Sequence, residues 1–318
     1  MKEIDIHSIE DFFIGNAEDT EGATGCTAIF CPKGAVCGVD VRGGAPATRE
    51  TDLLAPTAMA ETVHAVMICG GSAYGLAAAD GALAYLEEHG IGFDVGVAKV
   101  PIVPAAALFD LAVGDPKCRP DREMGYRALV NAEKNDAQEG IHGAGTGASL
   151  GKLFGPPRAM KSGLGFYAEQ VGELKVGAVV AVNCFGSVFD TDTHELIAGP
   201  LDEKKERVIS TVDTFKEMNC KDFNAFSANT TLGCILTNAA LTKAQITKVA
   251  QMAHNGYART ICPVHTSVDG DAIFALSSGK VEAHIDLVGA MAAEAMAKAV
   301  SRGVSVPSAY GFTGSLDL

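Results

Sequence analysis

Two strand-length apolar runs stand close together near the N-terminus, and their spacing constrains the fold more than any other feature. Thr24–Phe30 and Ala35–Val41 are short and apolar or alternating, and Pro32-Lys33-Gly34 lies between them. A Pro and a Gly between two such runs are typical of a tight turn, so we expect a β-hairpin here. Adjacent hairpin strands pair antiparallel, which argues against a doubly wound parallel sheet.

The rest of the chain mixes strand and helix patterns without strict β-α-β order. Further strands are expected from apolar runs of strand length, at His64–Cys69, Val97–Val103, Leu174–Phe185, Thr231–Asn238 and Asp271–Leu276. Helices are expected from Ala-rich or amphipathic segments, at Ala73–Glu88, Gly125–Asn135, Glu203–Phe215, Lys243–Arg259 (with Thr242 as its N-cap) and His284–Val300. Lys216–Asn229 has no sustained period and is expected to be a loop. This order predicts an α+β chain in which sheets lie between helix layers.

The charge balance limits the partners of the protein. The net charge is −14, and a surface of that sign repels nucleic acid, whose binding needs Lys and Arg to neutralise phosphates. The first fifteen residues are too charged for a signal peptide. Apolar runs such as Val176–Val182 are far shorter than a membrane span. We therefore expect a soluble cytoplasmic protein that binds neither nucleic acid nor membrane.

Metal and nucleotide sites are also disfavoured by the residue patterns. The nine cysteines contain no C-x-x-C pair, and the eight histidines contain neither H-E-x-x-H nor an i, i+4 pair. Gly143–Ala148 (GAGTGA) matches G-x-G-x-x-A, but a polar segment precedes it instead of a strand. We expect a turn whose free N–H groups bind an anion or a developing negative charge. His265, near Asp269, is interpreted as a loop histidine with local hydrogen bonds.

The junction between Asn229 and Thr230 has a possible chemical meaning. It follows the irregular segment and directly precedes a buried strand. If the Asn229 carbonyl meets the Thr230 hydroxyl, an N→O acyl shift followed by hydrolysis frees Thr230 as a new N-terminus. Its α-amine, with a pKa of about 7.7–8.0, can then act as general base for its own hydroxyl. Taken alone, the pattern favours an ordinary threonine before a strand.

Longer stretches resemble the family of self-processing aminopeptidases and amidases that includes L-aminopeptidase/D-esterase, β-aminopeptidases and nylon-oligomer hydrolase. The matching stretches span nearly the whole chain in the family's order: TGCT at 24–27, GVDVRGGAPATRETDLL at 38–54, GGSAYGLAAADG at 70–81, VPAAALFDLAVGD at 103–115, GAGTGASLGK at 143–152, VGAVVAVNCFG at 176–186, NTTLGCILTNAALTKAQ at 229–245 and DGDAIFALSSG at 269–279.

The resemblance implies a fold and a processing event. The fold would be a four-layer αββα sandwich of the N-terminal-nucleophile type, formed by residues 1–318 as a single domain. One cut after Asn229 would divide the chain into subunits 1–229 and 230–318, which stay together. Thr230 would then be the nucleophile. The resemblance also implies a homo-oligomer of such cleaved heterodimers, and no cofactor or metal.

Four further residues receive roles from the resemblance. Asn183 matches an asparagine that supports the oxyanion, and an amide at a strand end can donate to one. Lys152 matches a lysine near the nucleophile. Asp269 and Asp271 match two acids that orient the nucleophile and assist processing, although D-G-D is also a common turn sequence. In an extended segment, carboxylates at i and i+2 point the same way.

The sequence says less about the substrate and the residues that bind it. Phe109 stands where some relatives carry a tyrosine that contacts the oxyanion or substrate, so that donor is missing here. Phe109 and Tyr74 are the candidate substrate-binding residues. The implied substrate is a short peptide, an amino-acid amide or a linear ω-amino amide oligomer. Two alternatives stay open: an acyltransferase of the ornithine acetyltransferase type, and an uncleaved binding protein without catalytic activity.

Overall fold

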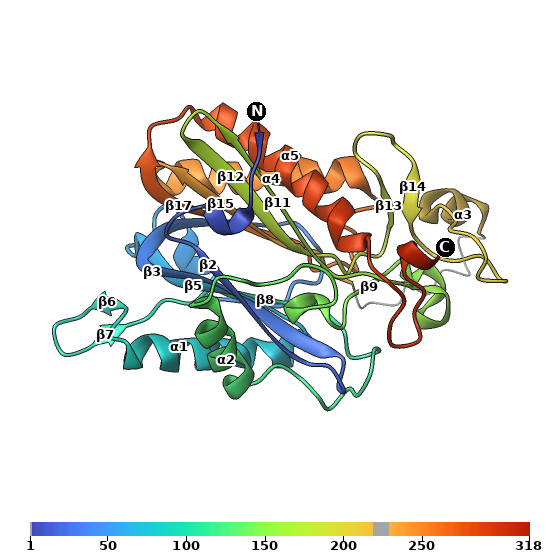
Figure 1. The fold of residues 1–318 in the computed structure, drawn as a ribbon, viewed down its shortest axis with the longest axis horizontal. Coiled ribbons are helices and arrows are strands. Elements are labelled where there is room, and N and C mark those ends of the chain that lie inside the picture. The colour runs from blue at the N-terminus through green and yellow to red at the C-terminus, as the bar shows by residue number, and fades with distance from the viewer. Residues whose placement is uncertain (1, 219–228) are drawn as a thin grey trace.

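A computed structural model describes residues 2–218 and 229–318. Its centre is one long strand, β3 (Thr24–Val41), which belongs to two sheet regions. The first part of β3 pairs with β2 (Phe13–Asp19) and β5 (Thr62–Cys69). The last part pairs with β17 (Ala272–Val281). Figure 1 shows the strands at the centre, with helices on opposite sides.

The expected hairpin is therefore wrong. Thr24–Phe30 and Ala35–Val41 are one strand, and β5 pairs with both runs, with a register shift between Phe30 and Ala35. The chain does not reverse, because the two runs have different additional partners, β2 and β17. Pro32, which has no N–H to donate, lies in the resulting bulge.

Each sheet region has its own spatial order of strands. The first contains β1 (Lys2–Glu3), β11 (Leu164–Val171), β12 (Leu174–Ala181), β15 (Leu232–Ala239), β17 and β3; the second contains β2, β3, β5, β8 (Ala105–Ala107) and β4 (Thr48–Arg49). In the first region only β15 and β17 pair in parallel, and they do so side by side. Short strands pair outside this sheet: β6 (Phe93–Asp94) with β7 (Lys99–Val100), β9 (Ser149–Leu150) with β10 (Met160–Lys161), and β13 (Ser187–Phe189) with β14 (Leu196–Ala198) and β16 (Ile261–Cys262).

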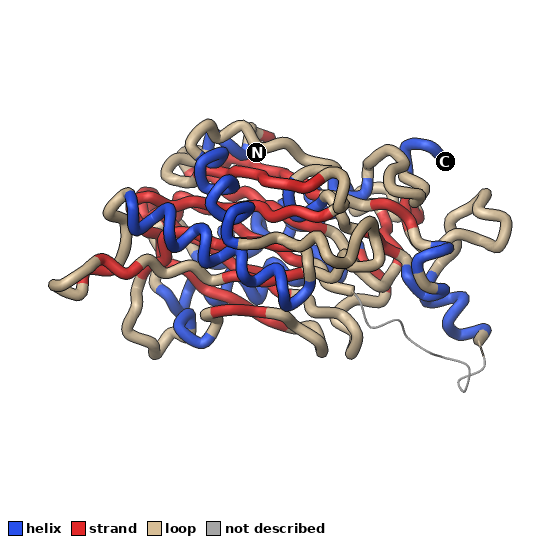
Figure 2. The backbone as a smooth tube through the Cα atoms, turned by 90° about the horizontal axis from the view of Figure 1, so that it is seen from below, coloured by secondary structure: helices blue, strands red, loops and turns tan. Residues whose placement is uncertain are grey.

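Helices cover the outer faces of both regions. Helices α4 (Lys243–Thr260) and α5 (Ile285–Val304) share an apolar core with β11, β12, β15 and β17. Helices α1 (Ala78–Glu88) and α2 (Arg122–Ala132) share another core with β3, β5 and β8. A third core joins strands of both regions to each other. In the view of Figure 2, helices lie across the strands, and α3 (Thr211–Glu217) stands at one end of the molecule.

Several expected elements are confirmed. The strands expected at His64–Cys69, Thr231–Asn238 and Asp271–Leu276 correspond to β5, β15 and β17, and the helices expected at Ala73–Glu88, Gly125–Asn135, Lys243–Arg259 and His284–Val300 correspond to α1, α2, α4 and α5. Helix α1 is preceded by a 3-10 turn over Ser72–Ala77. Thr242 caps α4 as expected and forms a capping box with Gln245. The strand expected at Leu174–Phe185 is β12, which ends at Ala181.

Two further expected elements are wrong. In place of a strand over Val97–Val103 there is the two-residue strand β7, and Val97 is 95% exposed. In place of a helix over Glu203–Phe215, the chain turns until Ser210, whose side chain caps α3. Asp202 accepts backbone hydrogen bonds within the turn, and such local bonds compete with helix formation.

The expected loop Lys216–Asn229 begins within α3 and otherwise falls mainly on residues 219–228, which lie outside the described residues. No helix in the described ranges combines the length and apolar character that crossing a membrane requires.

Candidate active site

The peptide that joins Asn229 to Thr230 is held on both sides at one end of the first sheet region. The N–H of Thr230 donates to the carbonyl oxygen of Asn183 at 2.9 Å. The N–H of Gly270 donates to the carbonyl oxygen of Asn229, also at 2.9 Å. These bonds extend the pairing of β15 with β12 and β17 beyond the start of β15. The peptide is therefore fixed between two neighbouring chain segments.

The hydroxyl of Thr230 lies against this same peptide. Its Oγ1 donates a short hydrogen bond to the carbonyl oxygen of Asn229. Asn229 is 2% exposed and Thr230 4% exposed, so bulk water has little access to the pair. The hydroxyl is therefore next to the carbonyl group that an N→O acyl shift would attack.

Asn183 lies two residues beyond β12 and has a fixed amide orientation. Its Oδ1 accepts hydrogen bonds from the N–H of Ser149 at 3.1 Å and from Nζ of Lys152 at 2.7 Å. Two donors on one atom identify that atom as the oxygen. The Nδ2 of Asn183 is buried and has no hydrogen-bond partner among the described residues. It is a donor available for a negative oxygen.

Lys152 reaches the Asn183 side chain from a 3-10 turn that follows β9. Gly151, at φ +69°, lies so close to the backbone of Gly199 that a Cβ would approach it to 2.2 Å. This contact brings Lys152, 3% exposed, to Asn183, where Nζ also lies 3.5 Å from the carbonyl oxygen. Burial lowers the pKa of the Lys152 ammonium to about 7. Lys152 can therefore lose its proton near neutral pH.

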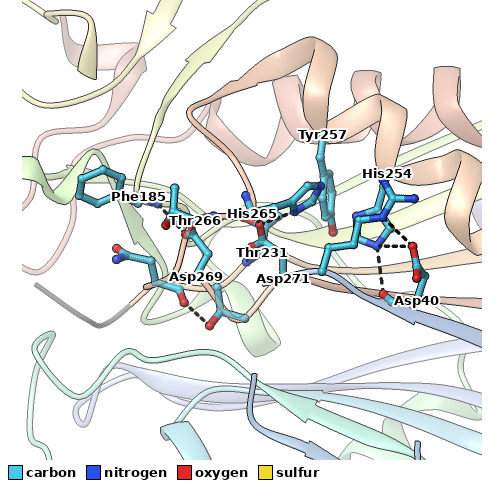
Figure 3. Close-up of polar contacts among 12 residues, drawn as sticks. Asp40, Phe185, Thr231, His254, Tyr257, His265, Thr266, Asp269 and Asp271 are labelled. Atoms are coloured by element: carbon cyan, nitrogen blue, oxygen red, sulfur yellow. Dashed lines mark hydrogen bonds and ion pairs between the residues drawn. The ribbon is translucent and has the colours of Figure 1, made fainter. Parts of the chain in front are cut away.

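The two carboxylates flank the junction and are occupied by backbone donors. Asp271 accepts the N–H of Thr231 at 2.7 Å on Oδ1 and the N–H of His265 at 3.0 Å on Oδ2. Asp269 accepts the N–H of Phe185 at 3.2 Å and the N–H and hydroxyl of Thr266. Burial, together with the charge of Asp271, raises the pKa of Asp269. Figure 3 shows Asp269 and Asp271 on the two sides of Thr231.

Glycines that the sequence analysis did not single out permit these close approaches. The N–H groups of Gly43 and Ala45 donate to the carbonyls of Asp271 and Asp269. A Cβ at Gly43 would lie 2.3 Å from the nitrogen of Asp271, and one at Gly270 would lie 2.7 Å from Oγ1 of Thr230. In the sequence, two features could have indicated these close approaches. They are the Gly-Gly pair in segment 38–54 and the glycine between Asp269 and Asp271.

A second buried lysine was also missed. Lys161 is fully buried, and its Nζ donates to the carbonyls of Gly145 at 3.1 Å and Ala148 at 2.7 Å. Burial lowers its pKa to about 7. This lysine holds the loop that leads to Ser149, the backbone donor to Asn183.

The expectation that the GAGTGA turn offers free N–H groups to an anion is wrong. Glu18 accepts the N–H of Gly143, and Thr27 accepts the N–H of Ala144. The N–H groups of Gly145, Thr146 and Ala148 donate to nearby carbonyls. Local acceptors in the protein occupy the donors that an anion would need.

The two candidate substrate-binding residues, Tyr74 and Phe109, differ in exposure. Tyr74 is 61% exposed, and its ring lies under the guanidinium of Arg119 at 3.8 Å. Phe109 is half-buried beside Asp110, a buried carboxylate that binds Thr24 and Gly71. In the part of the chain that the structure describes, no three His, Cys, Asp or Glu side chains are grouped to hold a metal ion.

Comparison with known sequences identifies relatives over most of the chain. A family model described as peptidase family S58 matches residues 5–314. The chain is 44% identical over 271 residues to an uncharacterized aminopeptidase of Mycobacterium leprae (strain TN), covering 82% of this chain and 72% of that protein. It is 30% identical over 304 residues to the 6-aminohexanoate-oligomer endohydrolase of Kocuria sp. (strain KY2), covering 90% and 82%. The resemblance noted in the sequence is confirmed.

Comparison with solved structures agrees on the fold. The L-aminopeptidase D-Ala-esterase/amidase of Ochrobactrum anthropi, described as a variant of the Ntn hydrolase fold, superimposes with a TM-score of 0.71. The match covers 94% of this chain and 85% of that chain at 17% identity. At this identity the likeness concerns the fold alone, which is mixed α/β and similar to that of Ntn hydrolases.

Proposed function

Because the chain belongs to peptidase family S58, a family with aminopeptidase and amide-oligomer hydrolase members, we propose that it cleaves its own backbone between Asn229 and Thr230 and then hydrolyses amide bonds with Thr230 as nucleophile. The hydrolase class rests on the family and the relatives. The proposal of self-cleavage rests on one observation. The Thr230 hydroxyl and the Gly270 N–H both donate hydrogen bonds to the carbonyl oxygen of Asn229.

The proposed cleavage step uses this geometry. Oγ1 of Thr230 attacks the carbonyl carbon of Asn229, and the negative oxygen accepts the N–H of Gly270. The C–N bond breaks, the Thr230 nitrogen takes up a proton, and an ester remains between Asn229 and Oγ1. Water then hydrolyses the ester, leaving a carboxylate on Asn229 and a free amine and hydroxyl on Thr230.

The freed amine would lie in a suitable environment to act as base. The Thr230 nitrogen is 2.9 Å from the Asn183 carbonyl oxygen, and Nζ of Lys152 is 3.5 Å from that oxygen. Two ammonium groups so close would repel each other, but the lowered pKa of Lys152 allows it to be neutral. The neutral α-amine then takes the proton of Oγ1 as the hydroxyl attacks a substrate carbonyl.

Asn183 would stabilise the oxyanion during substrate hydrolysis. Its backbone carbonyl accepts the N–H of Thr230, and its buried Nδ2 has no hydrogen-bond partner among the described residues. Ser149 and Lys152 hold the amide in one orientation. The leaving amine departs with a proton, and the acyl group stays on Oγ1 until water hydrolyses it. In this scheme Asp269 and Asp271 act by holding the segments around Thr230.

The finer architecture is part of the same proposal. Two helix pairs outside two sheet regions support a four-layer αββα sandwich of the N-terminal-nucleophile type. Residues 1–229 and 230–318 would form the two subunits of one domain, and copies would assemble as a cytoplasmic homo-oligomer. Substrates would be short peptides, amino-acid amides or ω-amino amide oligomers, as the names of the relatives suggest.

A substrate panel tests the proposed activity. Purified protein is incubated with L-amino-acid p-nitroanilides and with linear 6-aminohexanoate oligomers, with and without an added amine. We expect release of the amine product independent of added amine, and none from Thr230→Ala. Turnover only with added amine would indicate an acyltransferase, and no turnover by an uncleaved chain would indicate a binding protein.

A further inference from the structure

A histidine outside the proposed catalytic group makes two contacts with one of its carboxylates. His265 lies in the loop between β16 and β17, and its backbone N–H and its Nδ1 lie 3.0 and 2.8 Å from Oδ2 of Asp271. Its φ of +56° is in the left-handed region, which a non-glycine residue occupies only when its surroundings hold it there. Figure 3 shows the His265 ring directed at Asp271.

The identity of the donor follows from the other bonds of this carboxylate. Oδ1 of Asp271 accepts the N–H of Thr231, and Oδ2 accepts the N–H of His265. Each carboxylate oxygen therefore already has a backbone donor, and the contact with Nδ1 adds a third partner to Asp271. We assign the hydrogen of this contact to Nδ1 of His265, which then donates to Oδ2.

The rest of the ring lies in a closed environment. The His265 ring meets the buried ring of His254 edge-on, with 4.7 Å between centroids, and lies 6.1 Å from the ring of Tyr257. Nε2 of His265 is buried and has no hydrogen-bond partner among the described residues. A hydrogen on Nε2 would be a buried donor without an acceptor among these residues, which disfavours the tautomer that carries it.

Asp271 connects this ring to the junction. Its Oδ1 holds the N–H of Thr231, and on the same strand the N–H of Ala272 donates to the carbonyl of Thr231 at 3.2 Å. Gly270, on the other side of Asp271, donates to the carbonyl of Asn229. A rotation of the Asp271 side chain would release Thr231 and allow the junction to move away from the Gly270 N–H.

We propose that His265 is a positioning residue for self-cleavage. Its Nδ1–H fixes the Asp271 carboxylate, which accepts the N–H of Thr231. This contact keeps the Thr230 hydroxyl hydrogen-bonded to the Asn229 carbonyl. The inference rests on the proposed self-cleavage. His265 touches neither reacting atom in this scheme and acts through Asp271.

Two substitutions separate the ring donor from the backbone. His265→Gly keeps the backbone N–H and suits the positive φ, but removes the ring. His265→Asn restores a side-chain N–H donor on a residue that tolerates this conformation. The matched control is His194→Gly, because His194 is exposed and has φ +59°. Cleavage is followed by mass spectrometry of pulse-labelled chains made by cell-free synthesis, with the melting temperature measured for each product.

We expect His265→Gly to slow cleavage about 10²-fold, as for a misplacement of about 1 Å, and His265→Asn and His194→Gly to cleave close to the wild-type rate. Wild-type cleavage by His265→Gly would overturn the inference while leaving the self-cleavage intact. So would equally slow cleavage by His265→Asn and His265→Gly at unchanged melting temperatures. An uncleaved wild type would instead overturn the proposed function and the inference together.

A measurement on the wild type keeps the inference testable if His265→Gly fails to fold. Nitrogen-15 NMR of the histidine side chains distinguishes the protonated ring nitrogen. We expect the proton of His265 on Nδ1 at pH 8, with a loss of that tautomer preference in Asp271→Asn. A proton on Nε2 in the wild type would overturn the inference, because Nδ1 could not donate to Asp271.

Discussion

The backbone N–H of Gly270 lies 2.9 Å from the carbonyl oxygen of Asn229 and donates a hydrogen bond to it. The donor belongs to the residue between the two acids, and the acceptor is the carbonyl that the proposed cleavage attacks. A backbone donor already directed at this oxygen needs no rearrangement when negative charge develops on it.

Gly270→Ala should slow self-cleavage about 10²-fold, because a misplacement of about 1 Å costs that much. Its Cβ would lie 2.7 Å from Oγ1 of Thr230 and 2.8 Å from the carbonyl oxygen of Ala45, so the junction must shift. The rate is measured by mass spectrometry of newly made chains. Unchanged cleavage by a folded variant would show that this contact does not constrain the reaction.

Asn183→Asp should lower kcat of the cleaved enzyme about 10²–10³-fold with little change in KM, because it removes one oxyanion donor. The carboxylate still accepts from Ser149 and Lys152. Asn238→Asp is the control, since Asn238 is also buried but its Nδ2 donates to the Glu173 carbonyl. Equal losses in both variants would indicate a structural effect.

Lys152 and Lys161, both buried, should make stability rise with pH between 7 and 8. Burial lowers the pKa of Lys152 and of Lys161 to about 7, whereas an unfolded lysine titrates near 10.4. In this window the unfolded chain binds protons that the folded chain has released, so unfolding becomes less favourable as pH rises. Each lysine should contribute about 1 kcal/mol over that pH unit.

Urea unfolding at pH 7.0 and 8.0 measures this contribution. Lys152→Met should show a smaller gain than the wild type, whereas Lys33→Met, whose ammonium is exposed, should keep the full gain. Measurements stop at pH 8 because burial raises the pKa of thiols such as Cys26 and Cys31, which opposes the trend above about 8.5. A stability that falls from pH 7 to 8 would contradict the assignment.

Tyr74→Ala should leave kcat and KM nearly unchanged. The ring is largely exposed and its contact is with Arg119. Steady-state kinetics on the best p-nitroanilide of the panel checks this. A KM increase of about tenfold, the effect of losing about 1.4 kcal/mol of binding free energy, would show that Tyr74 contacts the substrate.

Part of the fold could be predicted from local patterns. Thr242 and Gln245 form a capping box that marks the start of α4, and the apolar run after Thr231 is β15. The Pro32-Lys33-Gly34 segment was misleading, because turn residues also suit a bulge, and pairing with β2 and β17 is decided by partners far away in the sequence. Tertiary packing decides such cases.

The candidate site was proposed mainly from resemblance and only in part from chemistry. Resemblance brought together Thr230, Asn183 and Lys152, and the hydrogen bonds join them. The expectation of local hydrogen bonds for His265 is confirmed by its contacts with Asp271, 6 residues away, although the sequence did not identify that partner. The contacts of Lys161 could not be predicted, because loop carbonyls 13 to 16 residues away become partners only after folding. A single histidine or lysine forms no repeating pattern in the sequence from which its role could be predicted.

Intact mass under denaturing conditions tests the central claim most directly, on the purified wild type and on Thr230→Ala. The account predicts two fragments from the wild type, 1–229 and 230–318, and one full-length chain from Thr230→Ala. A single full-length mass for the wild type after prolonged incubation would contradict the account.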